Sequence, residues 1–371
     1  MNNIIIGNGI DIQFGGIDYT NKSIIERALL YLKTGDFSTE VYPKEIEAWI
    51  YILHSAVPDF LNGHYDQLAV LRDEKEELNS IKRNYANNVS ISDIGFEYYF
   101  LLNELQCRKN KITNPERYYF QEFLRRLFLD SIFNKGEINN LHLKFPTKVV
   151  DYINSFDNIF TTNYDRNIEL ATAKNVLYLH GAFHVLDSVY DLNSFRNRIS
   201  DKPAENIPVI KGFEHTFSNS ITGSSGAFKL FSANQPELAN SAIEKFAKGM
   251  QENPDISLQI EEWKNSDNDI IKKLYEAVVF KTQEPDLKFS IDYSVNKLKS
   301  VEGKITFLGL SPNNDSHIMK IIKENIKVNT IEFYYFDEQE SVDINLFFDN
   351  KKVITESVTE FWNKKRQCIT L

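Results

Sequence analysis

The chain has little cysteine, glycine or proline. Its 371 residues include two cysteines, Cys107 and Cys368, together with 15 glycines and 10 prolines. Two distant thiols cannot supply the four ligands of a cysteine zinc ribbon, and a single pair makes no disulfide framework. We therefore expect two reduced thiols and no bound metal. The scarcity of glycine and proline favours regular elements over long loops.

Long apolar runs are missing as well. No stretch approaches the ~20 consecutive apolar residues that a membrane-spanning helix needs. The first residues, Met-Asn-Asn, lead directly into the apolar run Ile4–Ile6. They include neither the basic segment nor the small-residue cleavage site of a signal peptide. We expect a cytoplasmic protein that does not associate with membranes.

Basic residues are outnumbered by acidic ones. The chain has 42 lysines and arginines and 52 aspartates and glutamates, which gives a formal charge of −10. A general nucleic-acid binder needs a basic surface to neutralise phosphates, so this balance gives no strong sign of direct nucleic-acid binding. Apolar residues are plentiful at 42%, and they include 27 phenylalanines and 18 tyrosines. This composition is typical of a folded globular protein.

Short apolar runs alternate with helical patterns along the chain. The runs that read as strands are 4–6, 158–162, 175–179, 304–310 and 330–336. Helices are predicted at 22–34, 44–56, 95–106, 116–133, 165–173 and 315–328, and apolar residues recur at helical spacing in 44–56 and 116–133. Residues 66–86 are highly charged and are predicted to form an exposed helix with a loop. Alternation of this kind predicts an α/β fold, a Rossmann-like, doubly wound parallel sheet with large helical insertions.

The strand-forming pieces lie far apart, so we expect a discontinuous core. It comprises residues 1–21, 145–190 and 300–340. Residues 22–144 and 191–299 are predicted to be helical insertions between these pieces. Residues 341–371 are predicted to be a C-terminal extension.

Polar signatures follow four of the predicted strands directly. They are Gly7-Asn8-Gly9, Thr162-Asn163-Tyr164-Asp165, His180-Gly181 and Gly309-Leu310-Ser311. Parallel sheets of this class bind ligands in the crevice at the carboxyl ends of their strands. We therefore expect the four signatures to meet in one site.

Each signature has a functional and a structural interpretation. Glycines at 7 and 9 allow a tight turn whose N–H groups approach a phosphate, or they mark an ordinary strand–turn–helix. Asn163 and Asp165 can orient a water molecule and hold a ribose hydroxyl, but both residue types also favour a helix N-cap. Taken one at a time, these signatures leave both interpretations open.

The two remaining signatures are equally open. His180 can act as a general base or hold a ribose hydroxyl, and it can equally be a structural histidine. Ser311 offers a hydroxyl and a backbone donor, whereas Asn314 or Asp315 nearby could simply open a helix. His184 lies four residues after His180 without a helical HExxH pattern, so a metal is not expected.

Taken together and in order, the signatures resemble the sirtuin family. The stretch Gly7–Tyr19 is similar to the first sirtuin loop, with Asp18-Tyr19 in place of its Asp-Phe pair. Thr161–Asp165 resembles the sirtuin Thr-Gln-Asn-Ile-Asp motif, His180-Gly181 its catalytic His-Gly pair, and Gly309–Ser311 its late Gly-x-Ser loop.

The departures from that pattern point to a particular branch of the family. Asp11 replaces a serine, Thr20 replaces an arginine, and the cysteines of the zinc ribbon are absent. The chain instead resembles AbiH-type and related sirtuin-like proteins of bacterial phage defence. This resemblance implies cleavage of NAD to nicotinamide and ADP-ribose, with abortive infection by NAD depletion. It also implies a homo-oligomer and a possible hexameric translocase ATPase partner.

The resemblance further assigns roles to individual residues. It implies that Asn163 and His180 are catalytic, with Asn163 positioning water and His180 acting as base or holding ribose hydroxyls. It implies that Asp18 and Tyr19 line the nicotinamide pocket and that Ser311 contacts the adenosine side. The full set of expected NAD-binding residues is Gly7, Asn8, Gly9, Asp11, Asp18, Tyr19, Thr162, Asp165, Gly309 and Ser311.

Two other functions remain open on the sequence alone. A non-catalytic sensor could use the same pocket to bind NAD or ADP-ribose. Asp11 favours this alternative, because a carboxylate beside a pyrophosphate is unfavourable unless it is paired or bonds a ribose. A structural subunit of a defence complex is the second alternative, in which the helical insertions serve assembly.

Overall fold

The computed structural model describes residues 1–191, 194, 209–222, 226–286, 293–312 and 314–366. Six strands form one parallel sheet in the order β3-β2-β1-β4-β5-β6. Their bounds are β1 Asn2–Ile6, β2 Asn158–Thr161, β3 Val176–Tyr178, β4 Gly303–Leu308, β5 Val328–Tyr335 and β6 Lys352–Ser357. This strand order is that of the Rossmann fold, whose two halves diverge between β1 and β4. The predicted fold class is confirmed.

Strand β1 occupies the centre of the sheet because both of its faces are apolar. Ile4, Ile5 and Ile6 are fully buried, and β-branched residues fit a pleated surface well. Ile5 lies between Phe160 of β2 and Phe307 of β4 in the register of the sheet. An all-parallel sheet of this kind needs helices on both faces.

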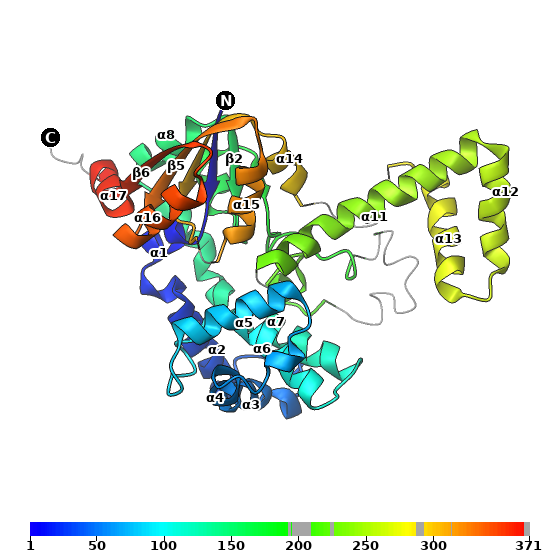
Figure 1. The fold of residues 1–371 in the computed structure, drawn as a ribbon, viewed down its shortest axis with the longest axis horizontal. Coiled ribbons are helices and arrows are strands. Elements are labelled where there is room, and N and C mark those ends of the chain that lie inside the picture. Colours follow the sequence, from blue (N-terminus) through cyan, green and yellow to red (C-terminus); the bar gives the residue numbers. More distant parts are fainter. Residues whose placement is uncertain (192–193, 195–208, 223–225, 287–292, 313, 367–371) are drawn as a thin grey trace.

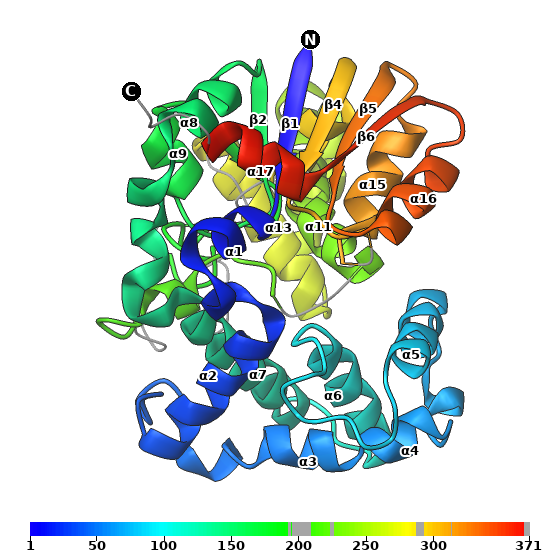
Figure 2. The same cartoon turned by 90° about the vertical axis from the view of Figure 1, so that its left-hand side faces the viewer.

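Helices cover the two faces of the sheet (Figure 2), and the residues on each face belong to a separate apolar cluster. Ile4 and Ile6 belong to the cluster shared with α8 (Thr147–Asn154), α9 (Asn167–Thr172) and α17 (Val358–Arg366). Ile5 belongs to the cluster on the opposite face, which is shared with α14 (Val295–Lys299), α15 (Ser316–Glu324) and α16 (Glu338–Phe347). Helix α1 (Gly9–Gly15) follows β1 at the carboxyl edge.

The C-terminal part of the chain differs from the sequence-based expectation. Residues 341–371 were expected to lie outside the core, but β6 pairs with β5 and forms the edge of the sheet. An edge strand has one neighbour and is partly exposed, so β6 lacks the buried apolar run that marks an inner strand. Strand β4 ends at Leu308, two residues earlier than expected, because Gly309 adopts a positive φ of 73°.

The first helical segment forms a body of its own below the carboxyl edge of the sheet (Figure 1). Its helices are α2 Asn21–Thr34, α3 Trp49–Ser55, α4 Val57–Leu61, α5 Arg72–Asn84, α6 Tyr98–Lys109 and α7 Glu116–Phe133. They enclose a separate aromatic-rich core, in which Trp49 stacks on Phe120 with ring centroids 3.9 Å apart. The helix expected over 44–56 is interrupted, since Lys44–Ile46 forms a short 3-10 turn before α3.

The second helical segment is an arm that projects away from the sheet and from the N-terminal helical body (Figure 1). It consists of α11 (Gly226–Glu252), α12 (Pro254–Glu262) and α13 (Asp269–Gln283). Helix α11 alone spans about 40 Å at 1.5 Å per residue. Small apolar clusters join the three helices to one another.

Two further observations concern the described residues only. None of their helices is both long and apolar enough to cross a membrane. Cys107 is a buried free thiol, whereas Cys368 lies outside the described residues.

Candidate functional site

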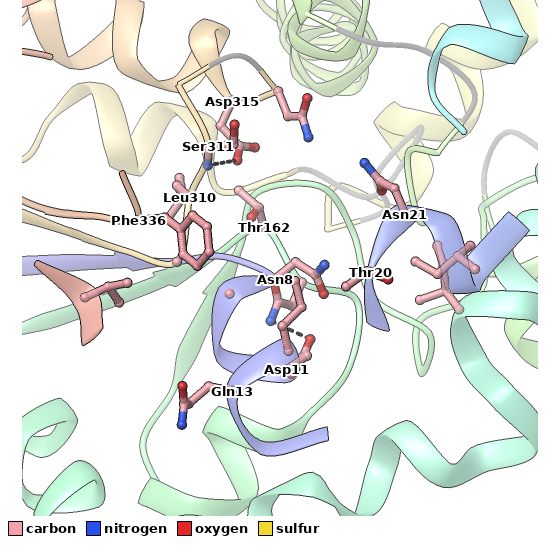
Figure 3. Close-up of a pocket in the computed structure, with 18 of the residues that line it drawn as sticks. Asn8, Asp11, Gln13, Thr20, Asn21, Thr162, Leu310, Ser311, Asp315 and Phe336 are labelled. Carbon is pink, nitrogen blue, oxygen red and sulfur yellow. Dashed lines mark hydrogen bonds between the residues drawn. The ribbon is translucent and has the colours of Figure 1, made fainter. Parts of the chain in front are cut away.

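A cavity of about 670 Å³ lies at the carboxyl edge of the sheet. The four strand-end signatures meet there, since the ends of β1, β2, β3 and β4 all contribute lining residues. Figure 3 shows Asn8, Asp11, Thr162 and Ser311 around this space. The volume is within the range of small-molecule and cofactor sites, and the position is the switch point at which Rossmann sheets bind their ligands.

Residues outside the four signatures also line the cavity. The N-terminal helical body contributes Phe96 and Glu97, and the first turn of the arm contributes Lys229. Phe336 after β5 and Trp362 of α17 supply aromatic surface at the side of the cavity formed by the C-terminal strands. All parts of the fold therefore contribute to this one site.

The glycines of the first and last signatures let two strand-end turns touch. A Cβ on Gly9 would lie 2.5 Å from Gly309 Cα, and one on Gly7 would lie 2.6 Å from the Gly309 oxygen. The Gly7 N–H donates to Leu308 O and the Gly9 N–H to Gly309 O, both at 2.9 Å. These two N–H groups, which were expected to hold a phosphate, are therefore already in use. The missing side chains of Gly7 and Gly9 let the turn after β1 lie against the turn after β4.

Two aspartates form a buried pair on the cavity wall. Asp11 and Asp165 are 2% and 4% exposed. Asn163 Nδ2 donates to Asp11 Oδ2 at 2.9 Å, and the Asn167 N–H donates to Asp165 Oδ1 at 2.8 Å. The oxygens that remain, Asp11 Oδ1 and Asp165 Oδ2, have no other hydrogen-bond partner among the described residues.

Burial raises the pKa of both carboxyl groups. The pKa of Asp11 rises well above its ordinary value, first because of burial and then because the charge of Asp165 is close. Burial also raises the pKa of Asp165, although the Asn167 N–H partly opposes the rise. Two adjacent carboxylates in a low-dielectric site disfavour each other's ionisation, so the second of the two gives up its proton less readily than the first.

His180 is fixed at the end of β3 by its backbone. The Leu179 N–H donates to Thr161 O at 2.9 Å and the Ile221 N–H donates to His180 O at 2.8 Å. Gly181 has a φ of +83°, and a Cβ there would lie 2.3 Å from Asn219 O, so only glycine fits. The segment 219–221 packs against the end of β3 and thereby fixes the backbone of His180.

A second histidine contacts the first. His180 Nε2 and His317 Nε2 lie 2.8 Å apart, and both side chains are buried. Burial and the nearby Lys229 ammonium lower the pKa of His317 to about 3, and burial lowers the pKa of His180 well below its ordinary value. Both rings are therefore neutral at physiological pH.

A third cluster links the arm to the cavity. The Lys229 ammonium donates to Glu97 Oε1 at 2.5 Å, and Lys229 is 4% exposed. The Ser311 N–H donates to Asp315 Oδ2 at 3.4 Å, as Figure 3 shows. Burial raises the pKa of Asp315 to about 7, although Lys229 opposes the rise. The described lining has five carboxyl groups and one ammonium, and that ammonium is already paired.

Nine of the twelve expected site residues line the cavity. They are Asn8, Gly9, Asp11, Thr162, Asn163, Asp165, His180, Gly309 and Ser311. Gly7 lies behind them in the turn. Tyr19 is buried in the core of the N-terminal helical body and Asp18 is exposed, so neither belongs to the lining. The short helix at Ile17–Tyr19 turns the chain away, and Asn8 Nδ2 donates to the Tyr19 carbonyl oxygen at 2.9 Å.

Sequence reasoning missed several residues at the site, among them Glu97, Lys229, Phe336 and Trp362 of the lining and His317 beside His180. His317 lies six positions after Ser311 in the same strand-end segment, so the order of the signatures offered a signal for it. Glu97, Lys229 and Trp362 come from helices that give no strand-end signal. Tertiary packing alone brings them to the cavity.

No group of three or more His, Cys, Asp or Glu side chains in the described part of the chain is placed to hold a metal ion. The comparisons with protein-family models, curated proteins and solved structures found no match for this chain.

Proposed function

We propose that the protein is an NAD hydrolase that cleaves NAD to nicotinamide and ADP-ribose. The observation that carries the proposal is the buried pair Asp11 and Asp165, whose pKa values are raised and of which Asp11 accepts a hydrogen bond from the Asn163 amide on the wall of the cavity. The position of the cavity at the switch point of a Rossmann-like sheet supports a dinucleotide as its ligand.

The reaction needs few groups. The nicotinamide ring nitrogen of NAD is positively charged and is bonded to C1′ of the ribose. When that bond breaks, its electron pair stays on the ring nitrogen and neutral nicotinamide leaves. The oxygen of water bonds to C1′, and its proton passes to the Asp11–Asp165 pair, whose raised pKa values favour accepting it.

The charge of the cavity suits this reaction. Positive charge moves from the nicotinamide ring to the ribose as the transition state forms. Buried carboxyl groups beside that centre stabilise it most in a site that excludes water. Lys229 is paired with Glu97, which leaves Asp11, Asp165, Asp315 and Glu340 as the other carboxyl groups of the described lining. Burial raises the pKa of these four groups, and each of them that ionises favours a ligand with a positively charged ring.

Individual residues take the following roles in the proposal. Asn163 orients the water molecule and the nicotinamide ribose, and His180 holds ribose hydroxyls. Thr162 and Ser311 offer hydroxyl groups along the remainder of the dinucleotide, with Ser311 on the adenosine side. Phe336 and Trp362 provide aromatic surface for the adenine.

The biological setting follows from the resemblance to sirtuin-like defence proteins. It supports cytoplasmic NAD depletion in abortive infection, with a hexameric translocase ATPase as a possible partner. Exposed apolar residues on the arm, Leu238 at 62% and Leu258 at 67%, support a homo-oligomer. Light scattering tests this last point, and a monomer at micromolar concentration would contradict it.

The enzyme and the sensor alternatives differ in one experiment. Purified full-length protein is incubated with NAD, and nicotinamide is measured by chromatography. Binding of ADP-ribose is followed by calorimetry in parallel. The hydrolase releases nicotinamide over many turnovers. Tight binding without release would establish the sensor instead, and the absence of both would leave a structural subunit.

A further inference from the structure

His180, which lines the cavity, shares one hydrogen bond with a second buried histidine, His317. The Nε2 atoms of His180 and His317 are 2.8 Å apart, and the two rings are inclined by 23° with centroids 5.0 Å apart. A hydrogen bond between two neutral imidazoles requires that one Nε2 carries a proton and the other offers a lone pair. The geometry therefore assigns different tautomers to the two rings.

The surroundings of His317 decide which ring donates. Its Nδ1 is fully buried and has no hydrogen-bond partner among the described residues. If His317 accepted at Nε2, its proton would sit on Nδ1 as a buried, unpaired N–H. Orphaned N–H groups are rarer in folded proteins than unpaired acceptors. The better satisfied arrangement places the proton of His317 on Nε2.

We propose that His317 is a positioning residue that donates its Nε2–H to His180 Nε2 and so holds His180 in the Nδ1–H tautomer. The ring of His180 then meets a ligand through Nδ1 as a hydrogen-bond donor. This inference rests on the proposed function for its catalytic meaning. It deepens that function, because it makes His180 a donor to a ribose oxygen and leaves proton acceptance to the Asp11–Asp165 pair.

The fold keeps His317 in place for this role. The residue is the second of α15, directly after the loop that carries Ser311 and Asp315. The buried face of α15, with Ile318, Ile321 and Ile322, packs in the apolar cluster of the sheet. The position of Nε2 is thus fixed by the sheet itself rather than by a surface loop.

Nitrogen NMR on histidine-labelled, full-length protein tests the tautomers without any ligand. We expect the His180 resonances to show a protonated Nδ1 and an unprotonated Nε2, and those of His317 the reverse. His215 is an internal reference, because its Nε2 lies 2.7 Å from the Asp130 carboxylate and must carry a proton. A protonated Nε2 on His180 would overturn the proposal, whether or not the protein cleaves NAD.

Two substitutions of similar volume separate positioning from packing. His317→Gln keeps a donor for His180, whereas His317→Leu fills the space without one. We expect His317→Leu to lower kcat for nicotinamide release by about 10–100-fold, the usual cost of losing an orienting partner. His317→Gln should stay within a few-fold of the wild type.

The kcat values and the tautomer of His180 test the hydrolase and the positioning role of His317 separately. Equal kcat for the two variants would refute the positioning role and leave the hydrolase intact. If the wild type releases no nicotinamide, the hydrolase fails, and the tautomer of His180 in the two variants still tests the positioning role. That tautomer should persist in His317→Gln and be lost in His317→Leu.

Discussion

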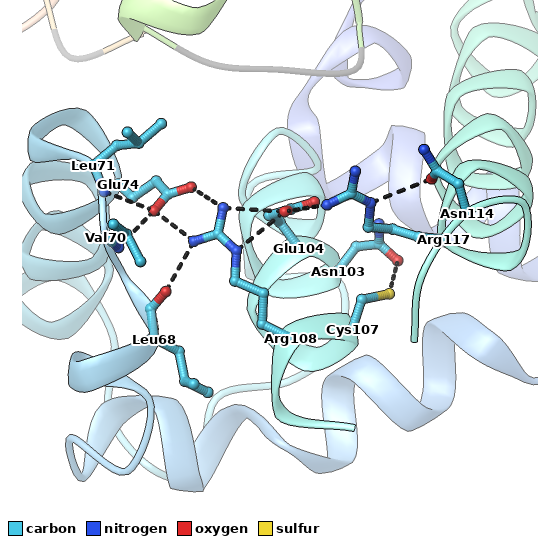
Figure 4. Close-up of polar contacts among 10 residues, drawn as sticks. All are labelled: Leu68, Val70, Leu71, Glu74, Asn103, Glu104, Cys107, Arg108, Asn114 and Arg117. Carbon is cyan, nitrogen blue, oxygen red and sulfur yellow. Dashed lines mark hydrogen bonds and ion pairs between the residues drawn. The ribbon is translucent and has the colours of Figure 1, made fainter. Parts of the chain in front are cut away.

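Buried carboxyl groups have opposite surroundings in the two main bodies of the molecule. In the N-terminal helical body, Glu74 is 2% exposed and accepts from both terminal nitrogens of Arg108, at 2.7 and 2.6 Å. The Val70 and Leu71 N–H groups complete its bonding (Figure 4). At the sheet edge, Asp11 and Asp165 lie close together, and no cation among the described residues bonds to either of them.

The pKa values record this difference. The Arg108 guanidinium and two backbone N–H groups lower the pKa of Glu74 in spite of its burial. Burial raises the pKa of Asp11 and Asp165. A fully bonded buried carboxylate holds a fold together, whereas an incompletely bonded one costs stability and persists where a function uses it. Glu74 therefore has the surroundings of a structural carboxylate, and Asp11 and Asp165 have those expected of the proposed functional site.

The largest effect is expected from substitutions in the cavity. Asn163→Ala and His180→Ala should each lower nicotinamide release by roughly 10²–10⁴-fold, because each removes a group that positions a reactant. Asn103→Ala is the matched control, since Asn103 is equally buried but bonds Trp49 Nε1 at 2.7 Å outside the cavity. Unchanged rates in both cavity variants would overturn the assignment of the site.

The second prediction concerns the paired carboxylate. Arg108→Met leaves Glu74 buried without its cation, so the free energy of unfolding should fall by about 3–5 kcal/mol. Arg72→Met removes the exposed ion pair with Glu76 and should cost far less, because solvent screens an exposed pair. Urea denaturation of the two variants measures both. A cost for Arg108→Met as small as that for Arg72→Met would show that Glu74 is not a structural site.

A smaller effect is expected for Asp315 and depends on pH. Burial raises its pKa from 3.8 when unfolded to about 7 when folded. The folded state therefore binds more protons than the unfolded state between these values, and this residue lowers stability as the pH rises from about 4 to 7. Asp315→Asn should be more stable than the wild type above pH 7, by at most about 4 kcal/mol, and the difference should vanish near pH 3.

Thermal or urea unfolding across this pH range measures the difference between the two proteins. Taking the difference removes the contributions of other titrating groups, including His180 and His317, that both proteins share. A difference that does not change with pH would mean that Asp315 is ionised throughout and that the cavity is wetter than its burial implies.

The sequence predicted those parts of the molecule that depend on local patterns. The inner strands could be recognised because their apolar runs are short and end in polar signatures, as at Ile4–Ile6 before Gly7. The four signatures could be predicted to lie close together, because the carboxyl ends of parallel strands lie at the same edge of the sheet. Strand β6 could not be recognised, because an edge strand needs no continuous apolar run.

The parts of the site that the sequence did not predict depend on contacts between distant segments. Lys229 pairs with Glu97 across 132 positions of the chain, and no local pattern marks either residue. His317 meets His180 because β4 and β3 end at the same edge of the sheet. Asp18 and Tyr19 match the family motif in sequence, but the short helix at Ile17–Tyr19 carries them away from the cavity.

The most direct test of the account compares the two kinds of carboxyl group in one assay. Nicotinamide and ADP-ribose released from NAD are measured per mole of folded protein for the wild type, Asp11→Asn and Glu74→Gln. The account predicts equal amounts of both products from the wild type. It predicts a loss of at least about 100-fold in Asp11→Asn and little loss in Glu74→Gln. No release by the wild type, or equal losses in the two variants, would contradict it.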